Sequence, residues 1–137
     1  MAMTDFEGRT ALITGAADGI GAALAEALLE AGARVFLSDI NEAKLKETAS
    51  RLKSPNAVCD VSDAKSVDAT VEAAWTEFGG VDLLCANAGV IVPGSLLEAS
   101  DEDARFIFGV NVWGVVNACR SHVLRLRASE RTGHILL

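Results

Sequence analysis

The chain has 137 residues, half of them hydrophobic, a net charge of −7 and a mean hydropathy of +0.30. This length suits one domain with a sizeable buried core and leaves no room for two, so we expect a single domain over residues 1–137. The acidic balance argues against partners that attract clustered lysine and arginine, namely nucleic acids and anionic membranes. No apolar run is as long as a membrane span, and segment 1–9 is short, polar and unlike a signal peptide. We therefore expect a cytoplasmic protein.

The cysteines and histidines give no sign of a metal or redox site. Cys59, Cys85 and Cys119 are odd in number and match no spacing typical of such sites. Two of them end apolar runs, which favours buried, unreactive thiols in a reducing compartment. His122 and His134 lack neighbours that would suggest a catalytic base, and we expect them on a helix surface and at a strand edge.

Short apolar runs alternate with helical patterns along the whole chain. We predict strands over 10–14, 34–38, 57–59, 81–86 and 134–137, and helices over 20–31, 42–52, 63–78 and 100–129. The strands are solid apolar runs, as expected of strands covered on both faces. The alternation predicts an α/β fold of the Rossmann type, a doubly wound parallel sheet with strand order 3-2-1-4-5 that is cut short in its fifth strand.

A glycine-rich turn joins the first predicted strand to the first helix. Gly15, Gly19 and Gly21 follow the spacing G-x-x-x-G-x-G. Glycines let the backbone turn sharply and approach a pyrophosphate, and the helix N-terminus offers free N–H groups and the positive end of its dipole. The flanking strand and helix favour a dinucleotide site over a simple tight turn. The predicted cofactor contacts from this turn are Gly15, Ala17, Asp18, Gly19, Ile20 and Gly21.

An acidic residue follows the second predicted strand. Asp39 comes about 20 residues after the glycine turn, where a carboxylate accepts hydrogen bonds from the adenosine ribose hydroxyls. Its charge would repel a 2′-phosphate, and Asp18 adds a second negative charge at a turn that holds no basic residue. We therefore predict NAD in preference to NADP, with Ile40 beside Asp39 in the site. The alternative is that Asp39 only caps a turn.

Four motifs in matching order and spacing resemble the short-chain dehydrogenase/reductase family, from about Gly8 to Leu137. They are Thr14-Gly15-x-x-x-Gly19-Ile20-Gly21, Cys59-Asp60-Val61, Asn87-Ala88-Gly89, and Asn111 within Val110-Asn-Val-Trp-Gly114. The resemblance implies hydride transfer between the nicotinamide and a small alcohol or carbonyl substrate. It also implies a homo-oligomer, either a dimer or a tetramer.

The resemblance assigns the second and third motifs to the adenine side of the pocket. Asp60 would accept a hydrogen bond from the adenine amino group, and the Val61 side chain would form a wall beside the adenine ring. The motif at 87–89 would support the pocket and stabilise the sheet. From the residues alone, the alternative for Asp60 is a surface position before the next helix, and for Asn87 and Gly89 a structural role in a tight turn is as well supported as ligand contact.

Asn111 lies in the middle of the long helix predicted to begin at an N-cap, Ser100. Asparagine is a poor helix former, so we expect it to disturb the hydrogen-bond ladder there. The resemblance makes Asn111 the asparagine of the family's catalytic tetrad, which holds a water linked to the active-site lysine. The alternative is a core amide whose hydrogen bonds are satisfied within the protein.

The other catalytic residues of the family have no counterpart in this sequence. The chain contains no tyrosine, and it ends at Leu137 before the expected serine and the Y-x-x-x-K motif. An apolar strand cut short and a helix that is apolar on several sides would both leave surface uncovered. We therefore expect a piece of a longer enzyme that is inactive by itself.

Two other functions remain open. One is a short module that binds NAD or another adenine nucleotide without chemistry. The other is an S-adenosylmethionine-dependent methyltransferase, a fold that also uses a glycine loop and an acid after the second strand. The Gly-Ile-Gly end of the turn and the motif at 87–89 argue against the methyltransferase.

Overall fold

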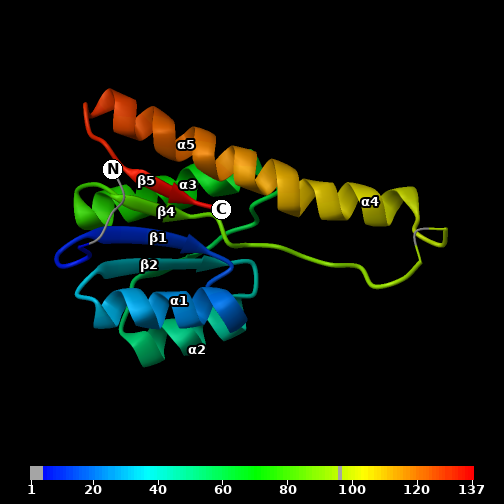
Figure 1. Ribbon diagram of the computed structural model, residues 1–137, viewed down its shortest axis with the longest axis horizontal. Helices are drawn as coiled ribbons and strands as arrows, with labels where there is room; N and C mark the ends of the chain where they lie inside the picture. Colours follow the sequence, from blue (N-terminus) through cyan, green and yellow to red (C-terminus); the bar gives the residue numbers. More distant parts are fainter. Residues whose placement is uncertain (1–4, 96) are drawn as a thin grey trace.

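The fold is a single parallel sheet between two layers of helices (Figure 1). A computed structural model describes residues 5–95 and 97–137, so the predicted N-terminal segment 1–9 and loop 87–98 are each described only in part. The sheet order is β3-β2-β1-β4-β5, which confirms the predicted fold class and strand order. The strands are β1 Thr10–Thr14, β2 Arg34–Asp39, β3 Asn56–Val58, β4 Leu83–Cys85 and β5 His134–Leu136.

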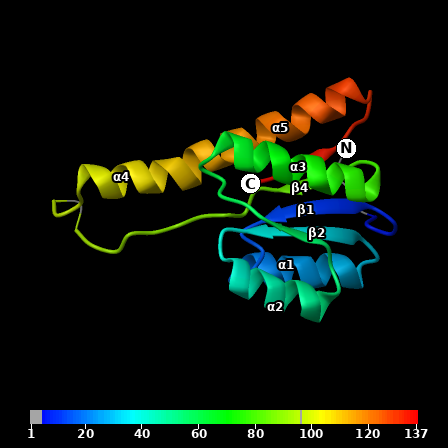
Figure 2. The ribbon, with the colours of Figure 1, turned by 180° about the vertical axis from the view of Figure 1, so that it is seen from behind.

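Helical segments connect the strands and cover both faces of the sheet. They are α1 Gly19–Glu30, α2 Glu42–Leu52, α3 Ala64–Phe78, α4 Asp101–Phe108, a π-helical segment η1 Gly109–Gly114, and α5 Val115–Ala128. Figures 1 and 2 show α1 and α2 together on one side of the sheet, with α3 and α5 on the other. No helix among residues 5–95 and 97–137 is long and apolar enough to cross a membrane.

Alternate residues of the central strand face opposite layers. In β1, Ala11 and Ile13 pack in the same cluster as residues of α1 and α2, whereas Leu12 packs with residues of α3 and α5. All three side chains are buried. Two buried faces explain why the strand is a solid apolar run rather than an alternating one.

The long predicted helix changes its winding in the middle. Ser100 caps α4 as predicted, because its hydroxyl accepts a hydrogen bond from the Asp103 backbone N at 3.0 Å, and the Asp103 side chain accepts one in return from Ser100. The π-helical segment η1 contains Asn111, which confirms that the hydrogen-bond ladder is disturbed there. In Figure 1, α4 extends beyond the sheet, and none of its residues is buried.

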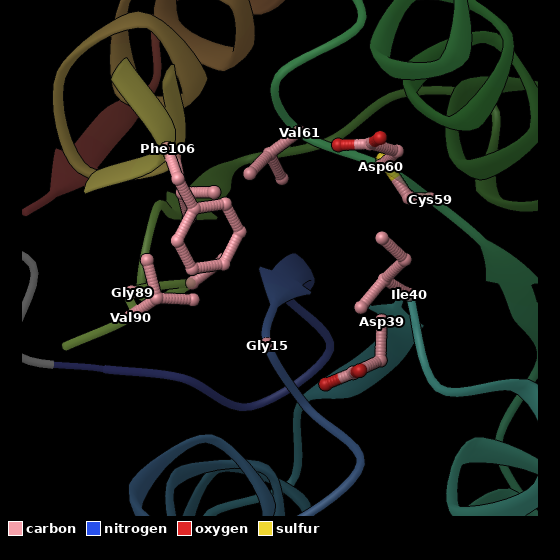
Figure 3. A pocket seen from close by; sticks show the side chains of 11 residues that line it. Gly15, Asp39, Ile40, Cys59, Asp60, Val61, Gly89, Val90 and Phe106 are labelled. Carbon is pink, nitrogen blue, oxygen red and sulfur yellow. The ribbon is translucent and has the colours of Figure 1, made fainter. Parts of the chain in front are cut away.

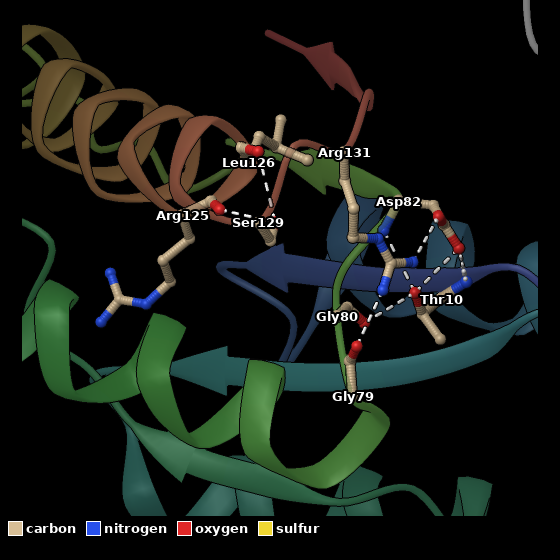
Figure 4. A network of polar contacts seen from close by, with 8 residues as sticks. All are labelled: Thr10, Gly79, Gly80, Asp82, Arg125, Leu126, Ser129 and Arg131. Atoms are coloured by element: carbon tan, nitrogen blue, oxygen red, sulfur yellow. Dashed lines mark hydrogen bonds and ion pairs between the residues drawn. The ribbon is translucent and has the colours of Figure 1, made fainter.

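Asp82 joins separate segments at the amino ends of β1 and β4 (Figure 4). Its Oδ2 accepts hydrogen bonds from the backbone N and the hydroxyl of Thr10, both at 3.0 Å, and its Oδ1 lies 3.2 Å from Nη2 of Arg131. Partial burial alone would raise the pKa of Asp82, but these contacts outweigh it and lower the pKa below its ordinary value. Arg131 also donates to the carbonyl of Gly79 at 2.7 Å, so the network fixes the end of the sheet away from the predicted site.

Candidate functional site

Most of the predicted site residues meet at the carboxyl ends of β1 to β4, the edge at which parallel α/β sheets bind ligands. Two hollows open there. The first hollow, drawn in Figure 3, is lined by Gly15, Asp39, Ile40, Cys59, Asp60, Val61, Ala88, Gly89, Val90, Phe106 and Val110. The second hollow is lined by Gly15, Asp18, Ile20, Gly21, Asp39, Asn87, Ala88 and Gly89. The hollows share part of their lining and therefore adjoin.

Three predicted site residues line neither hollow. Ala17 is buried, and its backbone N donates to Oδ2 of Asp39 at 3.1 Å. Gly19 begins α1 with a φ of +55°, and a Cβ added there would meet no atom within 4 Å. The space on the side to which a Gly19 side chain would point is therefore open. The third residue, Asn111, forms hydrogen bonds with Val90 in the segment that follows β4.

The glycine turn packs against the segment after β4 too closely for side chains. A Cβ on Gly15 would come within 2.8 Å of the Ala88 Cα, and one on Gly21 would come within 2.1 Å of the Gly15 carbonyl oxygen. Gly15 also has a φ of +66°, which favours glycine. These contacts explain the glycines at both positions by packing.

Asp18 caps α1 and forms an ion pair with α2. Its side chain accepts a hydrogen bond from the Gly19 backbone N at 2.7 Å and from Nζ of Lys44 at 2.5 Å. The hydrogen bond from Lys44 is the main cause that holds the pKa of Asp18 below its ordinary value. Asp18 thus carries the predicted negative charge, but Lys44 reaches it from the next helix and forms an ion pair with it, a contact that was not predicted from the sequence.

Asp39 closes the turn after β2 and lines both hollows. Its Oδ1 accepts from the Asn41 backbone N at 2.9 Å, and its Oδ2 accepts from Ala17. The turn-capping role that we considered as an alternative is thus present. It holds the carboxylate at the edge of both hollows, between the second strand and the glycine turn.

Asp60 and Val61 form one wall of the first hollow between β3 and α3. Asp60 Oδ1 accepts from the backbone N and the hydroxyl of Ser62 at 2.9 and 2.6 Å, as in an ordinary turn before a helix. Val61 is buried, and its carbonyl accepts from Nδ2 of Asn117 at 3.0 Å. A Cβ on Gly114 would come within 2.7 Å of the Val61 side chain, so η1 and α5 hold this wall closely.

The motif at 87–89 ties β4 to the glycine turn. Nδ2 of Asn87 donates to the carbonyl oxygens of Thr14 and Gly15 at 3.0 and 3.1 Å. The Thr14 hydroxyl accepts from the Ala88 backbone N at 3.1 Å. A structural role for this motif is therefore present, while Ala88 and Gly89 also line both hollows.

Asn111 holds the segment that follows this motif. Its Oδ1 accepts from the Val90 backbone N at 2.8 Å, and its Nδ2 donates to the Val90 carbonyl at 2.9 Å. Both ends of the amide are used within the chain, as in the alternative, but Asn111 is exposed and its expected position in the core is wrong. The π-helical turn directs the side chain away from the ladder of its own helix.

The cysteines are free and two are buried, as expected of unreactive thiols. Burial raises the pKa of Cys85 to about 11 and also raises the pKa of Cys59, which lines the first hollow. His134 lies on the edge strand β5 as predicted. The prediction of a surface position for His122 is wrong, because α5 packs this side chain into the interface with α3, where it is fully buried against Trp75.

The motifs did not identify every residue that lines the first hollow. Cys59 and Val110 stand in the motifs but were not predicted to line the site, and Val90 and Phe106 lie outside the motifs; all four line this hollow. Phe106 and Val110 are four positions apart on a helix and therefore share a face. That spacing was a usable signal, although only the position of α4 shows which face meets the hollow.

The fold and the geometry of this edge define a Rossmann-type α/β domain. The profile of the short chain dehydrogenase family matches residues 9–137. The chain belongs to this family.

The similar proteins are longer than this chain, which matches only part of each of them. The chain is 38% identical over 135 residues to 2,3-dihydro-2,3-dihydroxybenzoate dehydrogenase of Bacillus subtilis, covering 95% of this chain and 51% of that protein. It is 42% identical over 133 residues to diacetyl reductase, (S)-acetoin forming, of Staphylococcus epidermidis, covering 93% and 52%. A short-chain dehydrogenase/reductase from Burkholderia phymatum, solved in complex with NAD, has a TM-score of 0.92 and 37% identity over 97% of this chain and 49% of that one. The chain thus spans about half the length of these relatives.

Proposed function

We propose that residues 1–137 form one NAD-binding domain of an oxidoreductase that transfers hydride between the nicotinamide and a small alcohol or carbonyl substrate. The observation that carries this proposal is the second hollow at the start of α1, which Ile20 and Gly21 line and which shares Asp39 with the first hollow. The helix N-terminus would hold the pyrophosphate, and Asp39 would accept hydrogen bonds from the adenosine ribose. Membership of the family and the NAD-bound relative support this proposal.

The proposal separates cofactor binding from turnover. The chain contains no tyrosine, the residue that acts as acid or base in the family by resemblance. We therefore expect this chain alone to bind NAD without oxidising alcohols. Asn111 would join the catalytic residues only beside the tyrosine, lysine and serine of a longer chain.

Replacing Asp39 with asparagine should narrow the preference for NAD over NADP by about tenfold or more. The amide keeps one oxygen acceptor and so gives up one of the two backbone hydrogen bonds that Asp39 accepts, and it removes the charge that repels a 2′-phosphate. Titration calorimetry with both nucleotides measures the ratio of their Kd values. Glu42→Gln removes a carboxylate from α2 outside both hollows and is the matched control. Equal Kd values for NAD and NADP in the unmodified chain would contradict the preference.

We also propose a homo-oligomer, a dimer or a tetramer, that covers the outer side of the long helical segment. Trp113 and Leu124 are each more than half exposed there. The mass from light scattering should be two or four times that of one chain, and Trp113→Asp should lower it because a charge would be buried in the interface. A monomeric mass for the unmodified protein would exclude this assembly.

A further inference from the structure

Phe106 is an aromatic residue at the site that no motif connected with the cofactor. It stands on α4 and lines the first hollow together with Val110. Figure 3 shows its ring on the α4 side of the hollow, with Ile40 across the open space. Phe106 is 51% exposed and Ile40 is 66% exposed. Two large apolar side chains therefore face the same cavity while both remain in contact with water.

Packing of the protein core does not account for the position of Phe106. None of the residues of α4 is buried, so the ring is not held against the sheet. Phe108 on the same helix is 60% exposed and lines a separate hollow with Val92 and Pro93. The two phenylalanines thus share a helix and a similar exposure but face different spaces.

The walls of the first hollow define the chemistry of a fitting ligand. Ile40 and Phe106 offer apolar surfaces from the end of β2 and from α4, and Asp60 supplies a carboxylate from the segment after β3. A flat heteroaromatic ring with an exocyclic amino group matches these walls. Its faces would cover the apolar side chains, and its amino group would donate to the carboxylate. Aromatic side chains commonly provide such surfaces for nucleic acid bases.

We propose that Phe106 is a binding residue for the adenine of the dinucleotide and closes the first hollow from α4, opposite Ile40. This inference rests on the proposed function, because it places the adenine end of NAD in that hollow. Binding would bury ring surface that is exposed in the free chain and would connect the base to α4. Among the described helices and strands, α4 contacts chiefly η1, so the base would add a contact between α4 and the end of β2.

Replacing Phe106 with alanine tests this contact, with Phe108→Ala as the matched control. Titration calorimetry is performed with NAD and with ADP-ribose, which keeps the adenine and the pyrophosphate but lacks the nicotinamide. Phe106→Ala should raise the Kd for both ligands by about tenfold, because an aromatic surface under the base is lost. Phe106→Tyr keeps the ring and should restore binding. Phe108→Ala should leave both Kd values unchanged, and circular dichroism should show that all three variants remain folded.

The possible results separate this contact from the proposed function as a whole. Unchanged Kd values in Phe106→Ala would overturn the role of Phe106 while NAD binding by the unmodified protein still supported the proposed function. Equal losses in Phe106→Ala and Phe108→Ala would also overturn it, since only one of these rings faces the first hollow. If the unmodified protein bound neither ligand, the proposed function would fail, and the role of Phe106 would fail with it.

Discussion

Replacing Gly21 with alanine should raise the Kd for NAD by about tenfold or more and lower the free energy of unfolding by about 1–3 kcal/mol. The added Cβ would come within 2.1 Å of the Gly15 carbonyl oxygen and within 2.6 Å of Nδ2 of Asn87. These atoms are held in place because Asn87 donates to the carbonyls of both Thr14 and Gly15. The new methyl group must therefore push the glycine turn away from β4. That shift would displace the N-terminus of α1, where we propose that the pyrophosphate binds.

Unfolding in urea measures the loss of stability of Gly21→Ala, and titration calorimetry measures the change in NAD affinity. Gly109→Ala is the matched control, since its φ is −56° and the nearest atom to an added Cβ is the Cβ of Ser62, at an ordinary 3.8 Å. That control should keep or slightly raise the stability, because alanine loses less conformational entropy than glycine on folding. Similar stability and affinity in the two variants would contradict the proposed packing of the turn.

The sheet and its binding edge could be predicted because short, local patterns encode both. Solid apolar runs such as 10–14 and 34–38 identify strands that are buried on both faces, and the handedness of parallel connections leaves few possible strand orders. Once the order is known, residues that follow different strands must meet at one edge. Asp39, Asp60 and Gly89 therefore come together although they are far apart in the sequence.

Contacts between separate helices could not be predicted in the same way. Lys44 forms an ion pair with Asp18 because α2 lies beside the start of α1, and no periodicity in the sequence reports that distance. The position of Phe106 at the first hollow depends likewise on where α4 lies. His122 is different, because its spacing of four from both Ala118 and Leu126 places it in a buried stripe of α5. Its polar side chain favoured a surface position, whereas packing against α3 determined the outcome.

Lowering the pH from 7.5 to 5 should reduce the free energy of unfolding by about 2 kcal/mol, because the unfolded chain binds a proton at His122 that the folded chain excludes. The imidazole is fully buried beside Trp75, and neither ring nitrogen has a hydrogen-bond partner among the described residues. Burial, with a smaller contribution from the charge of Arg125, lowers the pKa of His122 to about 4, while Asp82 opposes this shift. The unfolded chain binds a proton below a pKa of about 6.5 that the folded chain excludes, so stability present above that pH is lost as the pH falls toward 4.

Urea unfolding at a series of pH values measures this dependence in the unmodified chain and in two variants. His122→Leu should flatten the curve between pH 7.5 and pH 5, because it removes the titrating group and keeps an apolar side chain of similar size at the α3–α5 interface. Ser121→Ala changes a neighbouring buried position that does not titrate, and it should shift the whole curve by a constant amount. Asp82 loses its stabilising charge only at lower pH, because its pKa lies below the ordinary 3.8, and therefore does not mask the slope. An unchanged slope in His122→Leu would show that another group binds the proton on unfolding.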